Sequence, residues 1–163
     1  CWRDRDHLYI HGANNSRLTQ TLLTDECAVS ITHLDGLVLA RSAFHHSMNY
    51  RSVVIYGRFT AEDDPDAKAA AFKVFVEHVS PGRSSLVRPP SRAELAGTRR
   101  LRLALDEAVA KIRNWGVEDS EEDMAIPVWA GVQPLALTAS PLQPEPGCGE
   151  RMPPAAPAFI GRA

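Results

Sequence analysis

The chain has 163 residues, of which 44% are hydrophobic and 23% are charged, and its formal net charge is −2. This length and composition are typical of one globular domain with a substantial core. The lack of a basic stripe argues against a nucleic-acid partner, and no apolar run reaches the ~18 residues of a membrane span. The three cysteines share no metal-type spacing and form no even set, so we expect a cytoplasmic protein with no membrane partner.

The first elements along the chain are a strand, a turn and a helix. Leu8–Ile10 is a short aromatic and β-branched run, which predicts a strand, and the turn-rich cluster His11–Asn15 comes directly after it. Ser16 suits an N-cap, and the apolar spacing predicts a helix over Arg17–Leu23. A helix start can hold an anion, and the forked guanidinium of Arg17 suits phosphate. An ordinary capped helix with an exposed arginine is the alternative, and this motif taken alone favours it.

Two further strands flank a long polar segment. We expect a strand over residues 28–32, a two-residue hairpin turn at Asp35–Gly36, and its partner strand over residues 37–40. Residues 41–51 are dense in hydrogen-bonding side chains and are predicted to be a loop, which leads into a β-branched strand over Val53–Phe59. Polar groups crowded between strands are costly unless another polar group meets them.

The middle of the chain predicts two helices. Asp64 and Pro65 signal the start of the first helix, and Ser80–Gly82 ends it. Its predicted apolar face consists of Ala69, Phe72, Val76 and Val79. Ser91 and Glu94 form a capping-box pattern, which predicts a short helix near residues 91–96.

The last third of the chain gives weaker signals. Residues 99–113 fit both a strand and a helical face, so periodicity alone leaves both open. Residues 118–123 are an acidic loop, and Val128–Leu137 is the last expected strand. Residues 139–163 are rich in proline, and we expect a disordered tail there.

Several separate blocks, taken in order, resemble the pyridoxamine 5′-phosphate oxidase-like FMN-binding proteins. The resemblance covers roughly residues 1–138. The blocks that carry it are Leu8–Gly12, Ser16–Arg17, Leu34–Ser42, His45–Val53, Glu77–Arg83, Val87–Ser91, Glu94–Leu95, Ile126–Val132 and Pro134–Leu135. It implies a mainly β, α+β fold, namely a Greek-key split β-barrel with flanking helices, and it favours a strand near residues 100–105 with a turn after it. Because the chain begins where relatives have completed a helix and two strands, we expect that barrel to be incomplete at its N-terminus.

The resemblance also implies FMN as cofactor and a homodimer with the cofactor at its interface. It places Ser16 and Arg17 at the flavin phosphate, His11 and Gly12 beside the cofactor, and Ser52 at the flavin ring. The remaining cofactor-binding residues that it implies are Ser42, His45, Ser47, Tyr50, Arg51 and Trp129. His11 or His46 would be the catalytic residue that delivers a proton to a small-molecule substrate, because imidazole titrates near neutral pH.

These implications lead us to expect an FMN-dependent oxidoreductase. A non-catalytic flavin-binding module and a degenerate dimerising scaffold are the alternatives. A metal site at His11, His45 and His46 lacks a carboxylate or cysteine at supporting spacing, so we expect no metal ion. The acidic run at 118–123 is interpreted as a solvated loop. Ser47 and Ser52 lack a nucleophile elbow, which argues against a hydrolase.

Overall fold

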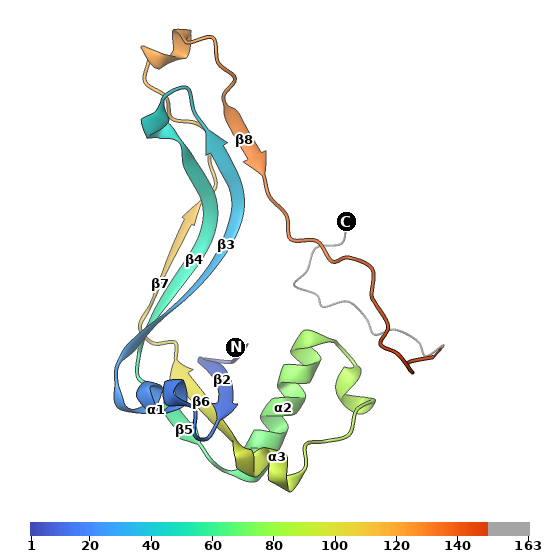
Figure 1. Ribbon diagram of the computed structural model, residues 1–163. Helices are drawn as coiled ribbons and strands as arrows, with labels where there is room; N and C mark the ends of the chain where they lie inside the picture. The colour runs from blue at the N-terminus through green and yellow to red at the C-terminus, as the bar shows by residue number, and fades with distance from the viewer. Residues whose placement is uncertain (150–163) are drawn as a thin grey trace. The chain divides into compact units, whose positions relative to one another are not determined.

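The computed structural model describes residues 1–149, which contain two four-stranded sheets and three α-helices (Figure 1). The chain divides into two compact units. Among the described residues, unit 1 contains residues 1–27, 56–107 and 138–149, whereas unit 2 contains residues 28–55 and 108–137. The expected α+β class is therefore confirmed. None of the helices in residues 1–149 combines the length and the apolar composition of a membrane span.

Unit 1 is a sheet with helices packed beside it. Its strand order is β1-β2-β6-β5, and every pairing is antiparallel. The strands are β1 (Trp2–Asp4), β2 (His7–Ala13), β5 (Thr60–Glu62) and β6 (Thr98–Ala104). The helices are α1 (Arg17–Thr24), α2 (Pro65–Val79), α3 (Arg92–Gly97) and the 3₁₀ turn η2 (Arg83–Ser85).

The core of unit 1 arises from the alternation of side chains along its strands. Leu8 lies opposite Leu103 in the β2–β6 pairing, so these two buried leucines share one face of the sheet. Trp2 and His11 contact Phe75 of α2 on the other face. Helix α2 thus covers one side of this sheet, and its apolar residues provide the burial that holds it there.

The helix starts in unit 1 match the sequence signals. The Asp64 carboxylate accepts a hydrogen bond from Ala67 N at 2.7 Å, and Pro65 occupies the first turn of α2. In α3, Ser91 and Glu94 form the complete capping box. Both starts are therefore confirmed, because the short polar side chains satisfy N–H groups that have no partner within the helix.

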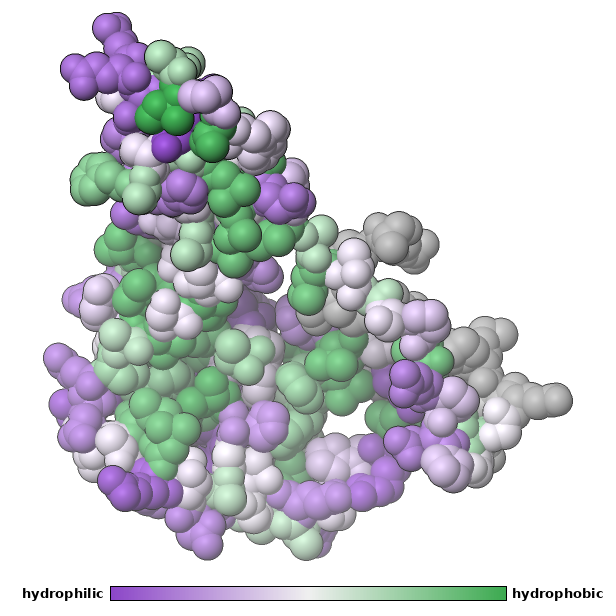
Figure 2. Space-filling model, turned by 45° about the horizontal axis from the view of Figure 1, so that its top comes forward, coloured by the Kyte–Doolittle hydropathy of each residue, from purple (hydrophilic) through white to green (hydrophobic). Residues whose placement is uncertain are grey.

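Unit 2 is built from the second sheet and two 3₁₀ turns, and it contains no α-helix. The strand order is β7-β4-β3-β8. Its strands are β3 (Cys27–Leu39), β4 (Ser47–Gly57), β7 (Ala108–Arg113) and β8 (Gly131–Pro134). The turns are η1 (Ala43–His45) and η3 (Asp123–Ala125). Several large apolar side chains on this sheet are exposed, among them Leu34, Met48, Val109 and Ile112, and Figure 2 shows hydrophobic residues at the surface.

The predicted hairpin turn at Asp35–Gly36 is wrong, because β3 runs straight through these residues. A tight two-residue turn requires a positive φ, and Gly36 does not adopt one. Gly36 instead pairs with Pro134 of β8, and a β-carbon at Gly36 would lie 3.2 Å from the carbonyl oxygen of Gln133. The glycine here permits a close approach between strands, which the local sequence does not distinguish from a turn.

Other element boundaries also differ from the sequence predictions. Residues 47–51 belong to β4 and residues 11–13 to β2, so both predicted loops are shorter than expected. Residues 108–113 form β7, where a turn was predicted, and β8 covers only residues 131–134. Residues 139–149 form no helix or strand, and the rest of the predicted disordered tail, residues 150–163, lies outside the described residues.

Candidate functional site

The first candidate site in unit 1 is the start of α1, which packs against the end of β2. Gly12 on β2 makes this packing possible, because a β-carbon at this position would lie 2.9 Å from the hydroxyl oxygen of Thr19. Thr19, in the first turn of α1, is only 4% exposed. A side chain at position 12 would therefore displace the helix start. The resemblance places Gly12 beside the cofactor, and the structure places it beside the start of α1.

The positive end of the α1 helix dipole is not neutralised by nearby protein groups among the residues that the structure describes. Ser16 is the N-cap, yet its side chain accepts no hydrogen bond from the helix, and the first turn contains no acidic residue. Arg17 is exposed, and no carboxylate within residues 1–149 pairs with it. Free N–H groups, the helix dipole and an unpaired guanidinium all favour an anion at this point.

The turn before α1 is anchored to α3. The amide nitrogen of Asn14 donates to the carbonyl of Gly97 at 3.2 Å, and its side chain donates to the carbonyl of Ala96. The Gln20 side chain donates to the Asn14 carbonyl at 2.9 Å. These bonds fix the position of the α1 start without using its own N–H groups.

Two arginines that the sequence analysis did not single out lie across from β2. In the β2–β6 register, Arg99 lies opposite Gly12, and Arg100 lies opposite His11. Arg100 is buried, forms an ion pair with Glu62 and lies 4.7 Å from the ring centroid of Tyr9, so its charge serves the structure. Burial lowers the pKa of its guanidinium from the ordinary value.

Arg99 has weaker polar contacts than Arg100. Its Nε lies 3.8 Å from the Asp63 carboxylate, and this buried atom has no hydrogen-bond partner. A buried donor without a partner is costly, and the 3.8 Å contact with Asp63 is too long to satisfy this one. The strand register reveals this residue, whereas single sequence motifs do not.

His11 is surrounded by aromatic rings. Its ring centroid lies 5.9 Å from that of Trp2, 5.4 Å from that of Phe72 and 5.5 Å from that of Phe75. Although part of the side chain stays exposed, this burial lowers the pKa of the imidazole below its ordinary value. His11 is therefore neutral at pH 7, where it can accept a proton.

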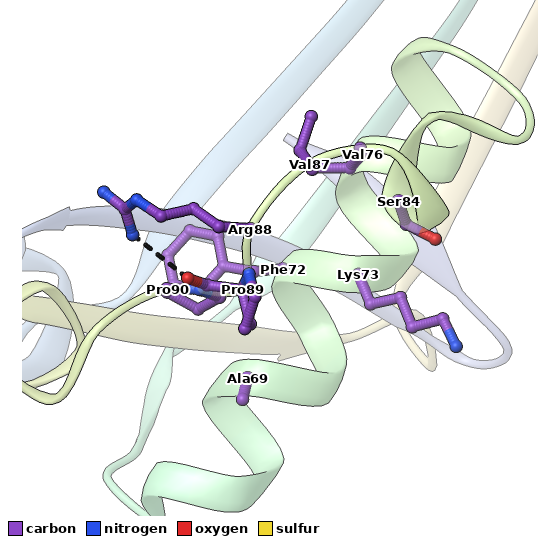
Figure 3. Close-up of a pocket in the computed structure, with 9 residues that line it drawn as sticks. All are labelled: Ala69, Phe72, Lys73, Val76, Ser84, Val87, Arg88, Pro89 and Pro90. Carbon is purple, nitrogen blue, oxygen red and sulfur yellow. Dashed lines mark hydrogen bonds between the residues drawn. The ribbon is translucent and has the colours of Figure 1, made fainter.

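A small recess lies on the side of α2 that faces η2 and the segment after η2 (Figure 3). Its volume is about 190 Å³, similar to the ~150 Å³ of an engineered cavity that holds benzene. Its lining is mostly apolar and includes Ala69, Phe72, Val76, Val87 and Pro90. Arg88 at this recess is already paired with Glu94 at 2.6 Å, so the recess offers shape but no unpaired arginine charge.

The candidate residues on the β3 and β4 strands of unit 2 make cross-strand contacts. The hydroxyl groups of Ser52 and Thr32 form a hydrogen bond of 2.9 Å. Arg51 forms a two-point ion pair with Asp35, both N–O distances being 2.9 Å, and this pair lowers the pKa of the Asp35 carboxyl. These contacts hold the two strands together and leave the Arg51 charge compensated.

Three other candidate residues of unit 2 are Ser47 and Tyr50 on β4 and Trp129 in the loop before β8. The Ser47 side chain is exposed, and the ring of Tyr50 lies 5.9 Å from the ammonium of Lys111. The Trp129 side chain is 68% exposed and packs over Gly131, where a β-carbon would lie 2.9 Å from the indole. Trp129 thus presents an aromatic surface to solvent.

Ser42 organises the two adjacent histidines. Its hydroxyl lies 3.0 Å from Nδ1 of His45, and its carbonyl oxygen lies 2.9 Å from Nδ1 of His46. A carbonyl only accepts, so Nδ1 of His46 carries the proton and its Nε2 is an acceptor. These histidines lie in and after η1, within the segment that the sequence predicts to be a loop.

Asp119 joins this turn to the acidic loop. Its carboxylate accepts bonds from the Arg41 backbone nitrogen at 3.0 Å and from Arg41 Nη1 at 3.0 Å. Nδ1 of His45 lies 3.9 Å from Asp119 and 3.7 Å from Asp123. The sequence analysis treated residues 118–123 as a solvated loop, but the Asp119 side chain is buried against Arg41.

The predicted cofactor residues thus form two groups. His11, Gly12, Ser16 and Arg17 belong to unit 1, and the group from Ser42 to Ser52 together with Trp129 belongs to unit 2. Within unit 1 the structure brings Gly12 to the start of α1, and within unit 2 it brings Ser42 to both histidines.

Comparisons with known proteins agree with this fold. The flavocytochrome Anf3 from Azotobacter vinelandii is 36% identical, with a TM-score of 0.88, over 93% of this chain and 71% of that chain. The FAD and haem binding protein from Mycobacterium smegmatis is 36% identical, with a TM-score of 0.87, over 93% of this chain and 76% of that chain.

A more distant structure shares the fold alone. It is a protein proposed to confer 5-nitroimidazole antibiotic resistance in Bacteroides thetaiotaomicron, which is 18% identical with a TM-score of 0.51 over 66% of this chain and 62% of that chain. No curated protein gives a significant match. Residues 1–112 match the family described as pyridoxamine 5′-phosphate oxidase, and the split-barrel class is confirmed by the two close structures. The chain therefore belongs to the pyridoxamine 5′-phosphate oxidase family.

Proposed function

We propose that this protein binds a flavin nucleotide, FMN, and that it acts as an FMN-dependent oxidoreductase. The observation that carries the proposal is the start of α1, where Ser16 leaves the first N–H groups without a side-chain cap and Arg17 has no acidic partner within residues 1–149. A phosphate group would satisfy both. Family membership and two neighbours that are named for flavin or FAD support the same ligand class.

The residues of unit 1 fit a flavin phosphate. Gly12 allows α1 to approach β2, so the helix N-terminus lies at the end of the strand, and Arg99 supplies a second cation opposite Gly12. The flavin would supply electron or hydride transfer when bound, and the protein would bind and orient it. FMN and FAD share the first phosphate and differ in the adenylate that FAD carries beyond it, and FMN is our proposal.

The protonation state of His11 suggests its role in this chemistry. Because its pKa is lowered, the imidazole is neutral at working pH and would accept a proton from a reducing substrate or a reduced cofactor. His46 has an exposed side chain with Nδ1 fixed by Ser42, which leaves Nε2 as the alternative proton carrier. The rate of flavin reoxidation is compared in His11→Phe and His46→Ala. The residue whose replacement slows this rate while flavin binding stays intact is the proton carrier.

The sheet of unit 2 supports a homodimer. This unit contains no α-helix to cover its sheet, and its exposed apolar residues include Val109 and Ile112 on β7. A sheet that exposes apolar side chains gains stability by burying them against a second layer. A second copy of the chain would provide that layer, and we place the cofactor at the resulting interface, with a small-molecule substrate.

A second candidate function is a flavocytochrome that holds haem beside the flavin. The observation that favours it is the 36% identity, over 93% of this chain, to two proteins named for haem or cytochrome. Imidazole and thioether groups are common axial ligands of haem iron. The described residues provide exposed donors of both kinds, among them His33 on β3 and Met48 on β4.

The central test is a titration of purified, flavin-free protein with FMN and with FAD, measured by calorimetry and by the absorbance spectrum. We expect binding of FMN at low micromolar concentration or tighter, and a loss of at least tenfold in Arg17→Gln. Arg92→Gln is the matched control, since Arg92 also opens a helix in unit 1. Folded protein that binds neither nucleotide contradicts the proposal, and equal binding by both variants removes Arg17 from the site.

Further measurements separate the alternatives. Turnover with NAD(P)H and an acceptor supports an oxidoreductase, whereas flavin binding without turnover supports a storage or carrier module. A Soret band in the purified protein supports the flavocytochrome alternative. Protein that sediments as a dimer and binds no flavin is the result expected of a degenerate scaffold.

A further inference from the structure

We propose that His45, Asp119 and Asp123 form a binding site for a divalent transition-metal ion. One imidazole and two carboxylates converge here, and their ligand atoms all lie within 4.8 Å of one another. The site lies entirely within unit 2, at the point where η1 meets the turn that contains η3. It is independent of the flavin proposal, because none of its argument uses the start of α1.

The distances between the three ligand atoms are slightly longer than those expected around a bound ion. Metal–ligand distances of about 2.0–2.2 Å place neighbouring ligand atoms about 3–3.5 Å apart. Nδ1 of His45 lies 3.7 Å from the Asp123 carboxylate and 3.9 Å from that of Asp119. These two separations are too long for hydrogen bonds, and each exceeds the spacing of neighbouring ligands on one ion by less than about 1 Å.

The two carboxylates are not fully compensated by protein groups. The Asp119 side chain is 1% exposed, and Arg41 is the one guanidinium that pairs with it in the described part of the chain. The Asp123 side chain is 24% exposed, and the His45 imidazole is its single ion-pair partner among residues 1–149. Arg41 compensates Asp119 alone, so whenever the His45 imidazole is neutral the two carboxylates leave one uncompensated negative charge, and partial burial of such a charge is costly.

Neighbouring groups act on two of the proposed ligands. The Asp119 carboxylate accepts hydrogen bonds from the Arg41 backbone nitrogen and from Arg41 Nη1, both at 3.0 Å, and such bonds favour its charged form. The Ser42 hydroxyl lies 3.0 Å from Nδ1 of His45, and an ion bound at this nitrogen would replace that hydrogen bond. One nitrogen and two carboxylate ligands suit Zn²⁺, Mn²⁺ or Fe²⁺ better than Mg²⁺ or Ca²⁺.

The structure also defines what the ion would do. His45 and Asp123 are separated by 78 positions in the chain, counting from residue 45 to residue 123. An ion bound to both would fix η1 to η3 and thereby fix the beginning of β4, which starts two residues after His45. Metal binding would therefore stabilise the folded state by mass action.

The experiment uses the full chain treated with a chelator and then dialysed. Titration with Zn²⁺ and with Mn²⁺ is measured by calorimetry, and thermal unfolding is measured with and without the ion. We expect one ion per chain, a higher Tm in its presence, and little response to Mg²⁺ at the same concentration. His45→Ala and Asp123→Asn should each weaken the affinity at least tenfold and abolish the rise in Tm.

Glu121→Gln is the matched control, because Glu121 is an exposed carboxylate in the same turn as Asp123. It should bind the ion as the unaltered chain does. Asp123→Asn is preferred to a change at Asp119, whose loss would release Arg41 and disturb folding. The proposal is overturned if the folded chain takes up no stoichiometric ion, or if His45→Ala and Asp123→Asn bind it with unchanged affinity.

Discussion

Gly12 and Thr19 touch at the point where β2 meets α1, and a β-carbon at position 12 would lie 2.9 Å from the Thr19 hydroxyl oxygen. This contact lets the helix start sit at the end of the strand. The strand residue and the helix residue are seven positions apart in the chain, so the contact is local in sequence. The absence of a side chain at Gly12 therefore sets the position of the free N–H groups at the start of α1.

Gly12→Ala should therefore destabilise the fold and weaken flavin binding. We expect a loss of about 1–3 kcal/mol in the free energy of unfolding, because the added methyl overpacks a buried contact. Urea unfolding measures this loss. A flavin titration measures the loss of affinity that a displaced α1 should cause. Gly97→Ala is the control, since a β-carbon there meets nothing within 4 Å.

A double variant tests the mechanism of this loss. Removing the hydroxyl in Thr19→Ala should relieve the clash, so Gly12→Ala should cost less in the Thr19→Ala background than in the unaltered chain. Equal costs in the two backgrounds would show that the contact is not the cause.

His11 should make stability fall as the pH is lowered through the range near 6.5. Its folded-state pKa is lowered from the ordinary 6.5, so below that pH the unfolded chain binds the proton more readily than the folded chain. Above about pH 7.5 both states are neutral at this residue and the contribution vanishes. His11→Phe keeps a ring among the aromatic residues and removes the proton, and unfolding is measured between about pH 8 and pH 5.5. A difference between the two proteins that stays constant across this range contradicts the argument.

Asn49 should stabilise unit 2 through a buried arginine. Its side-chain oxygen accepts a bond from Arg113 Nη1 at 2.6 Å, and both side chains are buried. Asn49→Ala leaves this donor without that partner, and we expect a loss of about 1.5–3 kcal/mol in the free energy of unfolding. Asn114→Ala, at an exposed residue one position after Arg113, should change it by less than about 0.5 kcal/mol.

The start of α3 should depend on the cap at Ser91. Its hydroxyl accepts a bond from the Glu94 amide at 3.3 Å, which completes the capping box. Ser91→Ala should cost about 1 kcal/mol, and Ser91→Gly only a few tenths, since glycine is itself a tolerated N-cap. Ser91→Thr retains the hydroxyl and serves as the control. Chemical denaturation compares the variants, and equal stability of all of them would mean that the cap contributes nothing.

Sequence patterns were reliable where the signal lies within one turn of a helix. Asp64 with Pro65 and Ser91 with Glu94 each satisfy N–H groups a few positions away, so their effect is present in the local sequence. The block resemblance likewise identified the family, because ordered motifs survive when the surrounding residues vary. The same local patterns misassigned Asp35–Gly36, because a glycine required by an adjacent strand has the same composition as a glycine required by a turn.

What the sequence by itself determined is the class of fold and the family, which follow from short blocks taken in order, and the helix start at Ser16 and Arg17, which follows from adjacent residues. Only the tertiary structure decided that Arg99 lies opposite Gly12 and that His45 meets Asp119 and Asp123. Those relationships arise from strand register and from loops brought together over long separations, and a pairing of that kind leaves no pattern in either segment alone.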